Sequence, residues 1–330
     1  MTPMVVMGYA AMMEQFSPTA LLDYCERAEK VGFPIVMASD HFHPWVPEQG
    51  ESGFSYAFMA ALGERTDQRF GPGVVCPSFR YHPAVVAHMA ATLEAMYPGR
   101  TYLGIGAGEA LNEAIVGGVW PDGGTRSRMM FEAVEIIEKL FTGDRVKHEG
   151  RYFSMDYARL YTLPDSPPPI YVATAGPLNA MRTGRYTDGM ITVGAPEQRI
   201  EGLFSQFEKG AKRADKDPSK MAKILQIHVS YAATDEEATD NAVKEWPNGG
   251  MAFPKADIRQ PEDFQAMAKL VEPKHYKNRV FISSDPKAHL EHVKHWASFG
   301  FDEIYVHNVG RNQEEFIEVY GEHVVPFVND

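Results

Sequence analysis

Short apolar runs alternate with longer amphipathic segments along almost the whole chain. Short runs are typical of strands, and apolar residues at helical spacing indicate helices with one packed face. The pattern predicts eight strands, near Val5–Tyr9, Pro34–Ser39, Phe70–Cys76, Tyr102–Gly106, Ile170–Thr174, Gly189–Val193, Ile224–Ser230 and Glu303–His307. It predicts helices over Pro18–Val31, Tyr56–Arg65, Pro83–Met96, Arg126–Phe141, Leu178–Tyr186, Pro196–Ala214, Asp235–Lys244, Pro286–Phe299 and Gln313–Val324.

Strands separated by helix-length segments indicate parallel βαβ units. Eight such units in 330 residues predict an α/β fold, a closed (β/α)8 TIM barrel with insertions. We expect one domain over residues 1–330. A doubly wound open sheet is the alternative.

Two stretches interrupt the alternation. Residues 143–169 end in three consecutive prolines, and we expect a small excursion there with short strands. Residues 246–279 are longer. A long irregular segment in a compact domain is usually a lid or a binding segment, although extra surface loops are the alternative.

Composition narrows the classes of function. The net charge of −12 gives no basic surface, so neither nucleic acid nor an anionic membrane is an expected partner. Cys25 and Cys76 lack metal-ligand spacing, so we expect no metal site and a reducing compartment. No signal peptide and no stretch of roughly 20 apolar residues are found, so we expect a cytoplasmic protein.

The end of the second predicted strand carries the first candidate chemistry. It reads Asp40-His41-Phe42-His43-Pro44-Trp45. A histidine there can accept a proton near neutral pH, and Trp45 could wall a pocket and donate its indole N–H. Asp40 could orient His41 or bind a cofactor. His43 is a rival for the role of base, and an ordinary polar turn is the alternative.

A glycine-rich segment follows the fourth predicted strand. Gly104, Gly106 and Gly108 precede Glu109, with Asn112 three positions later. The spacing is only a weak match to a dinucleotide fingerprint. We interpret the glycines as space for a flat ring against the backbone, with Glu109 and Asn112 directed at that ring.

Two further strand ends could contact a ligand. Cys76 ends the third strand, where it could touch a ligand or be a buried, inert thiol. Ala175-Gly176-Pro177 ends the fifth strand and opens a helix whose first turn holds Leu178 and Asn179. Free N–H groups and the helix dipole favour a phosphate there.

Several of these segments resemble the deazaflavin-dependent branch of the bacterial-luciferase-like family. The likeness runs from about Met7 to Phe327. Its landmarks are Gly8-Tyr9, Glu14-Gln15-Phe16, Asp40–Trp45, Phe79–Pro83, Tyr97–Arg100 and Gly106–Glu113.

The resemblance implies a TIM barrel that binds coenzyme F420 and transfers a hydride between a CH–OH group and the deazaflavin. It implies His41 as the base that takes the alcohol proton, Glu109 as the acid that serves the deazaflavin, and Trp45 as a substrate contact. The bond that matches the family's non-proline cis peptide is Gly73–Val74. The residues at the family's cofactor-contact positions are Asp40, Cys76, Ala107, Gly108, Asn112, Ala175, Gly176, Leu178 and Asn179.

The substrate is less constrained. Lys255 and Arg279 match two cations that hold the phosphate in the sugar-phosphate enzymes of this branch, but Val193 and Pro196 stand where two further phosphate contacts are expected. Glu14 is expected at the substrate. We favour a glucose-6-phosphate-like substrate or another polyol. A secondary-alcohol dehydrogenase or ketone reductase, an FMN monooxygenase of the luciferase type, and a binding protein without turnover are the alternatives. We expect a homodimer.

Overall fold

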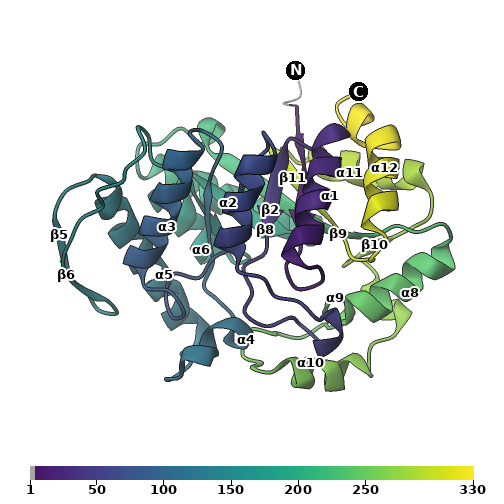
Figure 1. Ribbon diagram of the computed structural model, residues 1–330, viewed down its shortest axis with the longest axis horizontal. Coiled ribbons are helices and arrows are strands. Elements are labelled where there is room, and N and C mark those ends of the chain that lie inside the picture. Colours follow the sequence, from purple (N-terminus) through teal and green to yellow (C-terminus); the bar gives the residue numbers. More distant parts are fainter. Residues whose placement is uncertain (1–3) are drawn as a thin grey trace.

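The computed structural model describes residues 4–330, so residues 1–3 of the predicted domain lie outside it (Figure 1). Eight parallel strands follow one another around a barrel. Their order is β3 (Arg69–Pro72), β2 (Ile35–Ala38), β1 (Val6–Ala11), β11 (Glu303–Asn308), β9 (Ala222–Ser230), β8 (Gly189–Val193), β7 (Ile170–Ala173) and β4 (Leu103–Ile105).

The two ends of this order meet. Single bridges between Phe70 and Thr101 and between Val75 and Ile105 connect the β3 segment to β4. The barrel is therefore nearly closed, and all eight predicted strands are confirmed. The doubly wound open sheet is wrong, because an open sheet would leave β3 and β4 unpaired at opposite edges.

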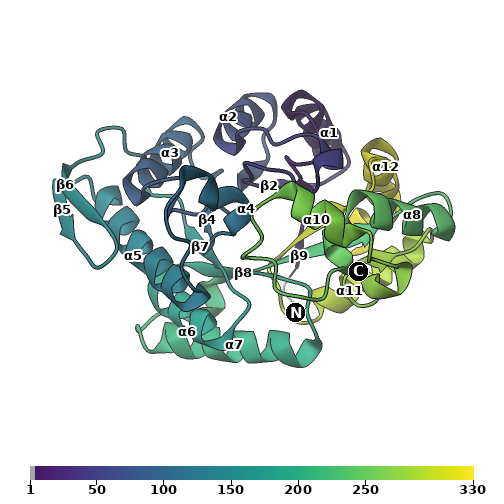
Figure 2. The same ribbon diagram turned by 90° about the horizontal axis from the view of Figure 1, so that it is seen from below.

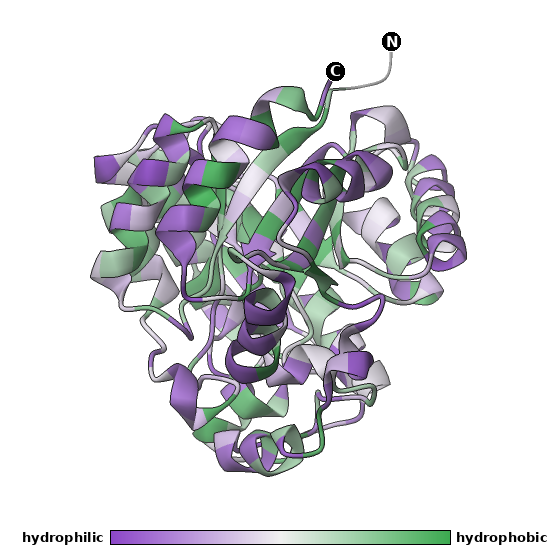
Figure 3. Ribbon diagram, turned by 90° about the vertical axis from the view of Figure 1, so that its right-hand side faces the viewer, coloured by the Kyte–Doolittle hydropathy of each residue, from purple (hydrophilic) through white to green (hydrophobic). Residues whose placement is uncertain are grey.

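Helices surround the strands, as Figure 2 shows. The nine predicted helices are all present, with ends that shift by a few residues. They are α1 (Pro18–Lys30), α2 (Ser55–Arg65), α3 (Pro83–Met96), α5 (Gly123–Phe141), α6 (Pro177–Tyr186), α7 (Glu197–Lys212), α8 (Asp235–Glu245), α11 (Pro286–Ala297) and α12 (Gln313–His323). Figure 3 shows hydrophilic and hydrophobic bands along the outer helices, as expected for helices with one face on the barrel.

The interior of the barrel is filled at one end by aromatic side chains. Tyr102, Tyr171 and Tyr305 are buried there, and the ring centroids of Tyr102 and Tyr171 are 5.4 Å apart. The Tyr305 hydroxyl donates to Glu303, which also pairs with Arg69. The core therefore fills the amino-terminal end of the strands, opposite to the end where functional sites of such barrels lie.

Residues 143–169 form the predicted excursion. It contains the antiparallel pair β5 (Val146–Glu149) and β6 (Ser154–Ala158). Figure 1 places this hairpin at the edge of the molecule, beyond α3 and α5. It contributes nothing to the carboxyl ends of the barrel strands.

Residues 246–279 form three short helical turns, α9 (Pro247–Gly250), α10 (Pro261–Ala268) and the 3-10 turn η4 (Pro273–Tyr276). Phe264 and Tyr276 are buried, and the Phe264 ring lies edge-on to that of Trp45 at 5.2 Å. The segment is therefore packed against the barrel mouth through its buried side chains.

Several short elements were not predicted. They are α4 (Ala110–Glu113), β10 (Phe281–Ile282) and the 3-10 turns η1 (Pro47–Gln49), η2 (Ala114–Val116), η3 (Pro218–Lys220) and η5 (Val325–Phe327). Strand β3 ends at Pro72 rather than Cys76, and the Gly73–Val74 peptide is cis, as the resemblance implied. No helix in residues 4–330 is both long and apolar enough to cross a membrane.

Candidate active site

A cavity of about 350 Å³ opens at the carboxyl ends of the barrel strands. Its walls come from the ends of β1, β2, β4 and β7–β9 and from the segment after β3, together with Trp246 from the start of the insertion. The sequence-predicted residues that line it are Glu14, Asp40, His41, Trp45, Cys76, Ala107, Gly108, Glu109 and Asn112. Strand ends that are far apart in the sequence therefore meet in one site, as expected for a barrel of this type.

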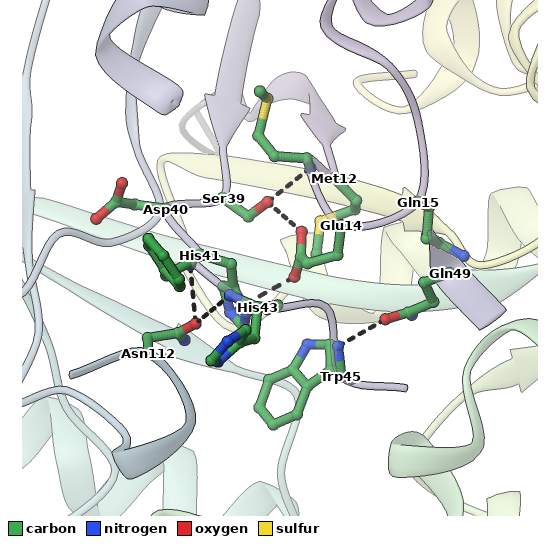
Figure 4. Close-up of polar contacts among 12 residues, drawn as sticks. Met12, Glu14, Gln15, Ser39, Asp40, His41, His43, Trp45, Gln49 and Asn112 are labelled. Carbon is green, nitrogen blue, oxygen red and sulfur yellow. Dashed lines mark hydrogen bonds and ion pairs between the residues drawn. The ribbon is translucent and has the colours of Figure 1, made fainter. Parts of the chain in front are cut away.

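The imidazole of His41 lies between a backbone carbonyl and a carboxylate (Figure 4). Its Nδ1 lies 3.1 Å from the His43 carbonyl oxygen, so Nδ1 carries the proton of the neutral ring. Its Nε2 lies 3.5 Å from Glu14 Oε1. The lone pair of the neutral ring is therefore on Nε2, the atom beside the carboxylate in the cavity.

Glu14 is completely buried behind His41. Its Oε2 accepts a hydrogen bond from Ser39, whose hydroxyl in turn accepts one from the Met13 amide at 2.8 Å. Its Oε1 accepts no hydrogen bond. The carboxylate is thus anchored on one oxygen and free on the other, which faces His41.

Trp45 offers an unused donor. The residue is buried, and its indole Nε1 has no hydrogen-bond partner in the described chain. The ring packs 5.1 Å from the His41 ring and edge-on against Trp246 at 6.2 Å. A buried indole N–H without a partner costs free energy unless a ligand satisfies it.

Asp40 does not orient His41. Its carboxylate accepts hydrogen bonds from Ser55 at 2.7 Å, from Arg80 at 2.6 Å and, more weakly, from Tyr81 at 3.5 Å. Figure 4 shows the carboxylate pointing away from the His41 ring. The hypothesis of an Asp40–His41 pair is wrong, because a buried guanidinium takes the carboxylate.

The same guanidinium contacts Glu113 on α4. The Arg80 amide donates to Glu113 Oε2 at 3.0 Å, and Arg80 Nη2 lies 3.5 Å from Oε1. The pKa of Glu113 is raised to about 7, because burial raises it most, Arg80 lowers it in part and the negative charge of Asp40 adds to the increase. Two carboxylates of the cavity wall therefore share one arginine.

Asn112 connects α4 to the loop after β2. Its Oδ1 accepts from the amides of Phe42 at 3.0 Å and His43 at 3.3 Å. The His43 ring donates from Nδ1 to the Leu111 carbonyl at 2.8 Å. His43 is absent from the cavity lining, so its ring serves the loop and is a poor rival for the role of base.

Glu109 stands at the start of α4 and lines the cavity. Burial raises the pKa of its carboxyl, while the nearby charges of His41 and Lys255 lower it and that of Glu14 raises it. The Ala110 amide donates to the Ala256 carbonyl at 2.8 Å, so the insertion is bonded to the peptide that follows Glu109.

The glycines before Glu109 make room for neighbouring protein atoms, and Gly106 and Gly108 also line the cavity. A Cβ on Gly106 would lie 2.5 Å from Val74 Cγ2, and one on Gly108 would lie 2.7 Å from Cys76 Sγ. Gly108 also has a φ of +78°, which favours glycine. Because these glycines have no side chains, β4 and the loop that follows it can lie close to the segment after β3.

Cys76 is an inert thiol in this setting. Its side chain is buried, and burial together with the charge of Glu113 raises the pKa of the thiol well above its usual range. A thiol with such a pKa is not a nucleophile near neutral pH. It remains available as a small contact surface in the cavity wall.

The start of α6 lies outside the lining of this cavity. Gly176 is its N-cap, no side chain caps the helix, and the space around the Gly176 Cα is open. Leu178 is exposed, and Asn179 accepts from the Ser127 hydroxyl at 2.6 Å. Ala175 is tied through its carbonyl to Arg199. The free amides of the first turn can therefore receive an anion.

Lys255 and Arg279 also lie outside the first cavity. Lys255 donates to the Asn248 carbonyl at 2.7 Å, and burial lowers the pKa of its amine, as does the charge of Arg279, while Glu109 opposes both. Arg279 lines a second cavity of about 460 Å³, which adjoins the first at His228. The structure thus brings Arg279 to an extension of the site.

Four residues of the site were not named as site residues from the sequence. Arg80 holds two carboxylates, and Gln226, His228 and Trp246 line the cavity. Gln226 and His228 occupy alternate positions of β9, so they face the same side of the strand. This alternation could have placed them inside a barrel, had the orientation of β9 been known.

Comparison with known proteins agrees with this architecture. Residues 4–303 match the model of the family described as luciferase-like monooxygenase. The F420-dependent glucose-6-phosphate dehydrogenase of Microbacterium testaceum (strain StLB037) is 36% identical over 322 residues, which cover 97% of this chain and 96% of that protein. The corresponding enzyme of Rhodococcus erythropolis (strain PR4 / NBRC 100887) is 36% identical over 325 residues, 97% and 96% of the two chains.

A solved structure is similar over the same length. It is an F420-dependent secondary alcohol dehydrogenase in complex with an F420-acetone adduct. Its TM-score is 0.93 at 34% sequence identity, and the match covers 99% of both chains.

Proposed function

This chain belongs to the luciferase-like family, and from that membership we propose that it is a dehydrogenase dependent on coenzyme F420. The substrate is an alcohol or sugar that gives up a hydride from its carbinol carbon. When bound, the deazaflavin accepts this hydride at ring carbon 5. Full-length similarity to F420-dependent dehydrogenases of two substrate types supports the proposal.

The observation that carries the proposal is the state of His41. Its Nδ1 proton is engaged by the His43 carbonyl, so Nε2 is the atom that can accept the alcohol proton. Glu14 then faces the protonated ring, and the free indole N–H of Trp45 in the same cavity can donate to the substrate oxygen. We assign His41 as general base, Trp45 as substrate contact and Glu109 as the acid that serves the deazaflavin.

The residues present fit a flat coenzyme with an acidic tail. A wall of small residues lies beside Asn112 in the cavity, and the uncapped start of α6 offers amides for a phosphate. Open space at Gly176 leaves room for that group. The residues we assign to coenzyme binding are Asp40, Cys76, Ala107, Gly108, Asn112, Ala175, Gly176, Leu178 and Asn179.

We favour a sugar phosphate or similar polyol as substrate, with Lys255 and Arg279 as its binding residues. Glu14, expected at the substrate, is buried behind His41 and is assigned to the His41 ring instead. Arg279 at the adjoining cavity can bind phosphate oxygens in a bidentate way. A secondary alcohol or ketone is the second candidate. The observation that favours it is the apolar Val193 side chain in the cavity lining, at a position where a phosphate contact was expected.

We further propose a single domain over residues 1–330, assembled as a homodimer in the cytoplasm. Two free cysteines, both buried, are compatible with a reducing compartment. Light scattering on the purified protein tests the oligomeric state directly.

A titration with oxidised F420, followed by a panel of alcohols and sugars, tests the function. We expect tighter binding of F420 than of FMN by calorimetry, and loss of the visible absorbance of F420 with at least one member of the panel. Oxygen consumption with reduced FMN, or binding of F420 without any turnover, would instead support the monooxygenase or the binding protein.

A further inference from the structure

We propose that His228 is a specificity-determining residue whose Nε2 accepts a hydrogen bond from a second hydroxyl group of the substrate. This inference rests on the proposed function and deepens it, because it selects polyols and sugars over monohydric alcohols. It follows from three side chains, Gln15, His307 and His228, which form a hydrogen-bonded chain behind the cavity.

The hydrogen-bonded series of side chains begins at Gln15, which is buried. Its Nε2 donates to the carbonyl oxygens of Val309 at 3.0 Å and Glu245 at 3.4 Å. Two carbonyl partners fix the amide orientation, because only the NH₂ group can donate to them. The Gln15 Oε1 therefore faces His307 Nε2, at 3.2 Å.

This contact decides the tautomer of His307. An amide oxygen only accepts, so His307 Nε2 carries the ring proton and Nδ1 of the neutral ring is left as an acceptor. His307 Nδ1 lies 2.9 Å from Nδ1 of His228, its direct partner in the register of β11 and β9. His228 must therefore donate from Nδ1.

Both rings are neutral near pH 7. Burial lowers the pKa of His228 to about 4, with the charge of Lys255 acting in the same direction. Burial lowers the pKa of His307 well below its usual range, and the neighbouring His228 lowers it further. A neutral His228 with its proton on Nδ1 has its lone pair on Nε2.

His228 belongs to the lining of both cavities, at the place where they adjoin. Its Nε2 has no hydrogen-bond partner within residues 4–330. The ring is held by Trp246, whose centroid lies 5.4 Å away and which also packs against His307 at 4.5 Å. The orientation of the ring is thus set by the protein before a ligand binds.

An acceptor at this place discriminates between ligands. A hydroxyl group can donate to Nε2, whereas a ketone oxygen or a phosphate dianion has only lone pairs to offer. The reacting hydroxyl belongs to His41 and Trp45, so the donor to His228 must be another hydroxyl of the same substrate. Its lowered pKa makes His228 a poor base, so its role is recognition.

Nitrogen-15 NMR of the histidine side chains tests the tautomer without any turnover. We expect His228, assigned by the loss of its signals in His228→Phe or His228→Gln, to carry its proton on Nδ1 at pH 7. Glucose 6-phosphate, used as a polyol probe, should shift the Nε2 resonance. A proton on Nε2, a doubly protonated ring, or an Nε2 resonance that stays unchanged at saturating probe would overturn the proposal.

Kinetics test the selectivity. The substrates are butan-2-ol and the three diols that add one hydroxyl to it, butane-1,2-, -1,3- and -2,3-diol. The ratio of kcat/KM for the best diol to that for butan-2-ol should be about ten in the wild type and about one in His228→Phe, the effect of one neutral hydrogen bond. The control is His295→Phe. His295 lines the second cavity but does not belong to the hydrogen-bonded series Gln15–His307–His228, so this variant should keep the wild-type ratio.

The two proposals fail in different ways. If these alcohols reduce F420 but the wild-type ratio is near one, or His228→Phe keeps it near ten, the role of His228 is wrong while the dehydrogenase stands. If no alcohol or sugar reduces F420, the dehydrogenase is wrong, and the proposed substrate contact is lost with it whatever tautomer NMR finds.

Discussion

Nε2 of His41 lies 3.5 Å from Oε1 of Glu14, an oxygen that accepts no hydrogen bond. The opposite ring nitrogen is engaged by a backbone carbonyl. When Nε2 takes up a proton, the positive charge of the ring therefore forms next to the Glu14 carboxylate. This arrangement would stabilise an imidazolium at His41, as the proposed role of general base requires.

Replacement of His41 by alanine should remove most of the turnover. General-base contributions are typically about 10²–10⁴-fold, and F420 binding should survive because the residues we propose for coenzyme binding do not include His41. The decrease in F420 absorbance and calorimetry measure the two effects. His43→Ala is the control and should keep most activity, since that ring bonds the Leu111 carbonyl. Wild-type turnover in His41→Ala would show that the role is misassigned.

Glu14→Gln should slow turnover while leaving the fold intact. The amide keeps the hydrogen bond with Ser39 but loses the charge that faces His41. A charge-assisted hydrogen bond is worth about 1.5–3 kcal/mol, so we expect kcat to fall roughly 10- to 100-fold. Ser39→Ala keeps the charge of Glu14, so kcat should fall less in this variant than in Glu14→Gln. An equal or larger loss of kcat in Ser39→Ala would mean that the position of the Glu14 carboxylate, and not its charge, determines the rate.

Gly176→Asp should weaken coenzyme binding. A carboxylate at this N-cap bonds the free amides of α6 and repels an anionic tail, and the open space around Gly176 accommodates it. We expect F420 affinity to fall about two- to fivefold at low salt, measured by calorimetry. The control is Gly202→Asp on α7, where space is also open. Unchanged affinity in Gly176→Asp places the tail elsewhere.

Arg279→Ala distinguishes the substrate classes. If the substrate is phosphorylated, KM for glucose 6-phosphate should rise roughly 10- to 100-fold and kcat should change less, because the phosphate is remote from the reacting carbon. For a neutral alcohol KM should stay nearly unchanged. Arg259→Ala, at an exposed arginine of the same insertion, is the matched control. Equal KM values for glucose 6-phosphate in wild type and Arg279→Ala would exclude a phosphate contact there.

Glu113 should make stability depend on pH. Its pKa is raised by burial from 4.5 to about 7 in the folded state, so the folded protein holds this proton more tightly than the unfolded chain. The resulting stabilisation is complete below about pH 4.5 and is lost as the pH rises to about 7. Over that window the free energy of unfolding of wild type should fall by on the order of 2 kcal/mol relative to Glu113→Gln. Denaturant titrations across the window measure the difference. Parallel pH profiles of the two proteins would contradict it.

The barrel strands could be predicted because each is a local apolar run of ordinary length. The turn α4 and strand β10 could not, since four and two residues leave no periodicity to detect. Of the site, His41, Glu109 and Trp45 meet in one cavity because parallel strands end at the same edge. The tie between Asp40 and Arg80 was missed, because nothing local to either residue signals a partner 40 positions away.

The pair formed by His228 and His307 illustrates the same limit. The two residues are direct neighbours across β9 and β11, but only the strand order brings them together. The glycines before Glu109 show a different limit of prediction from sequence. Their positions were recognised as places of close approach, yet the atoms that approach belong to Val74 and Cys76. Sequence spacing indicates that space is needed and leaves its occupant open.

Strand β11 lies between β1 and β9, so a strand from the start of the chain pairs with one from its far end. During synthesis β1 emerges from the ribosome early and β11 late. Until β11 emerges, the other strands form at most an open sheet with two unpaired edges, which are prone to wrong pairing. Until β11 has emerged, the nascent chain therefore has neither His307 nor a closed barrel around the cavity.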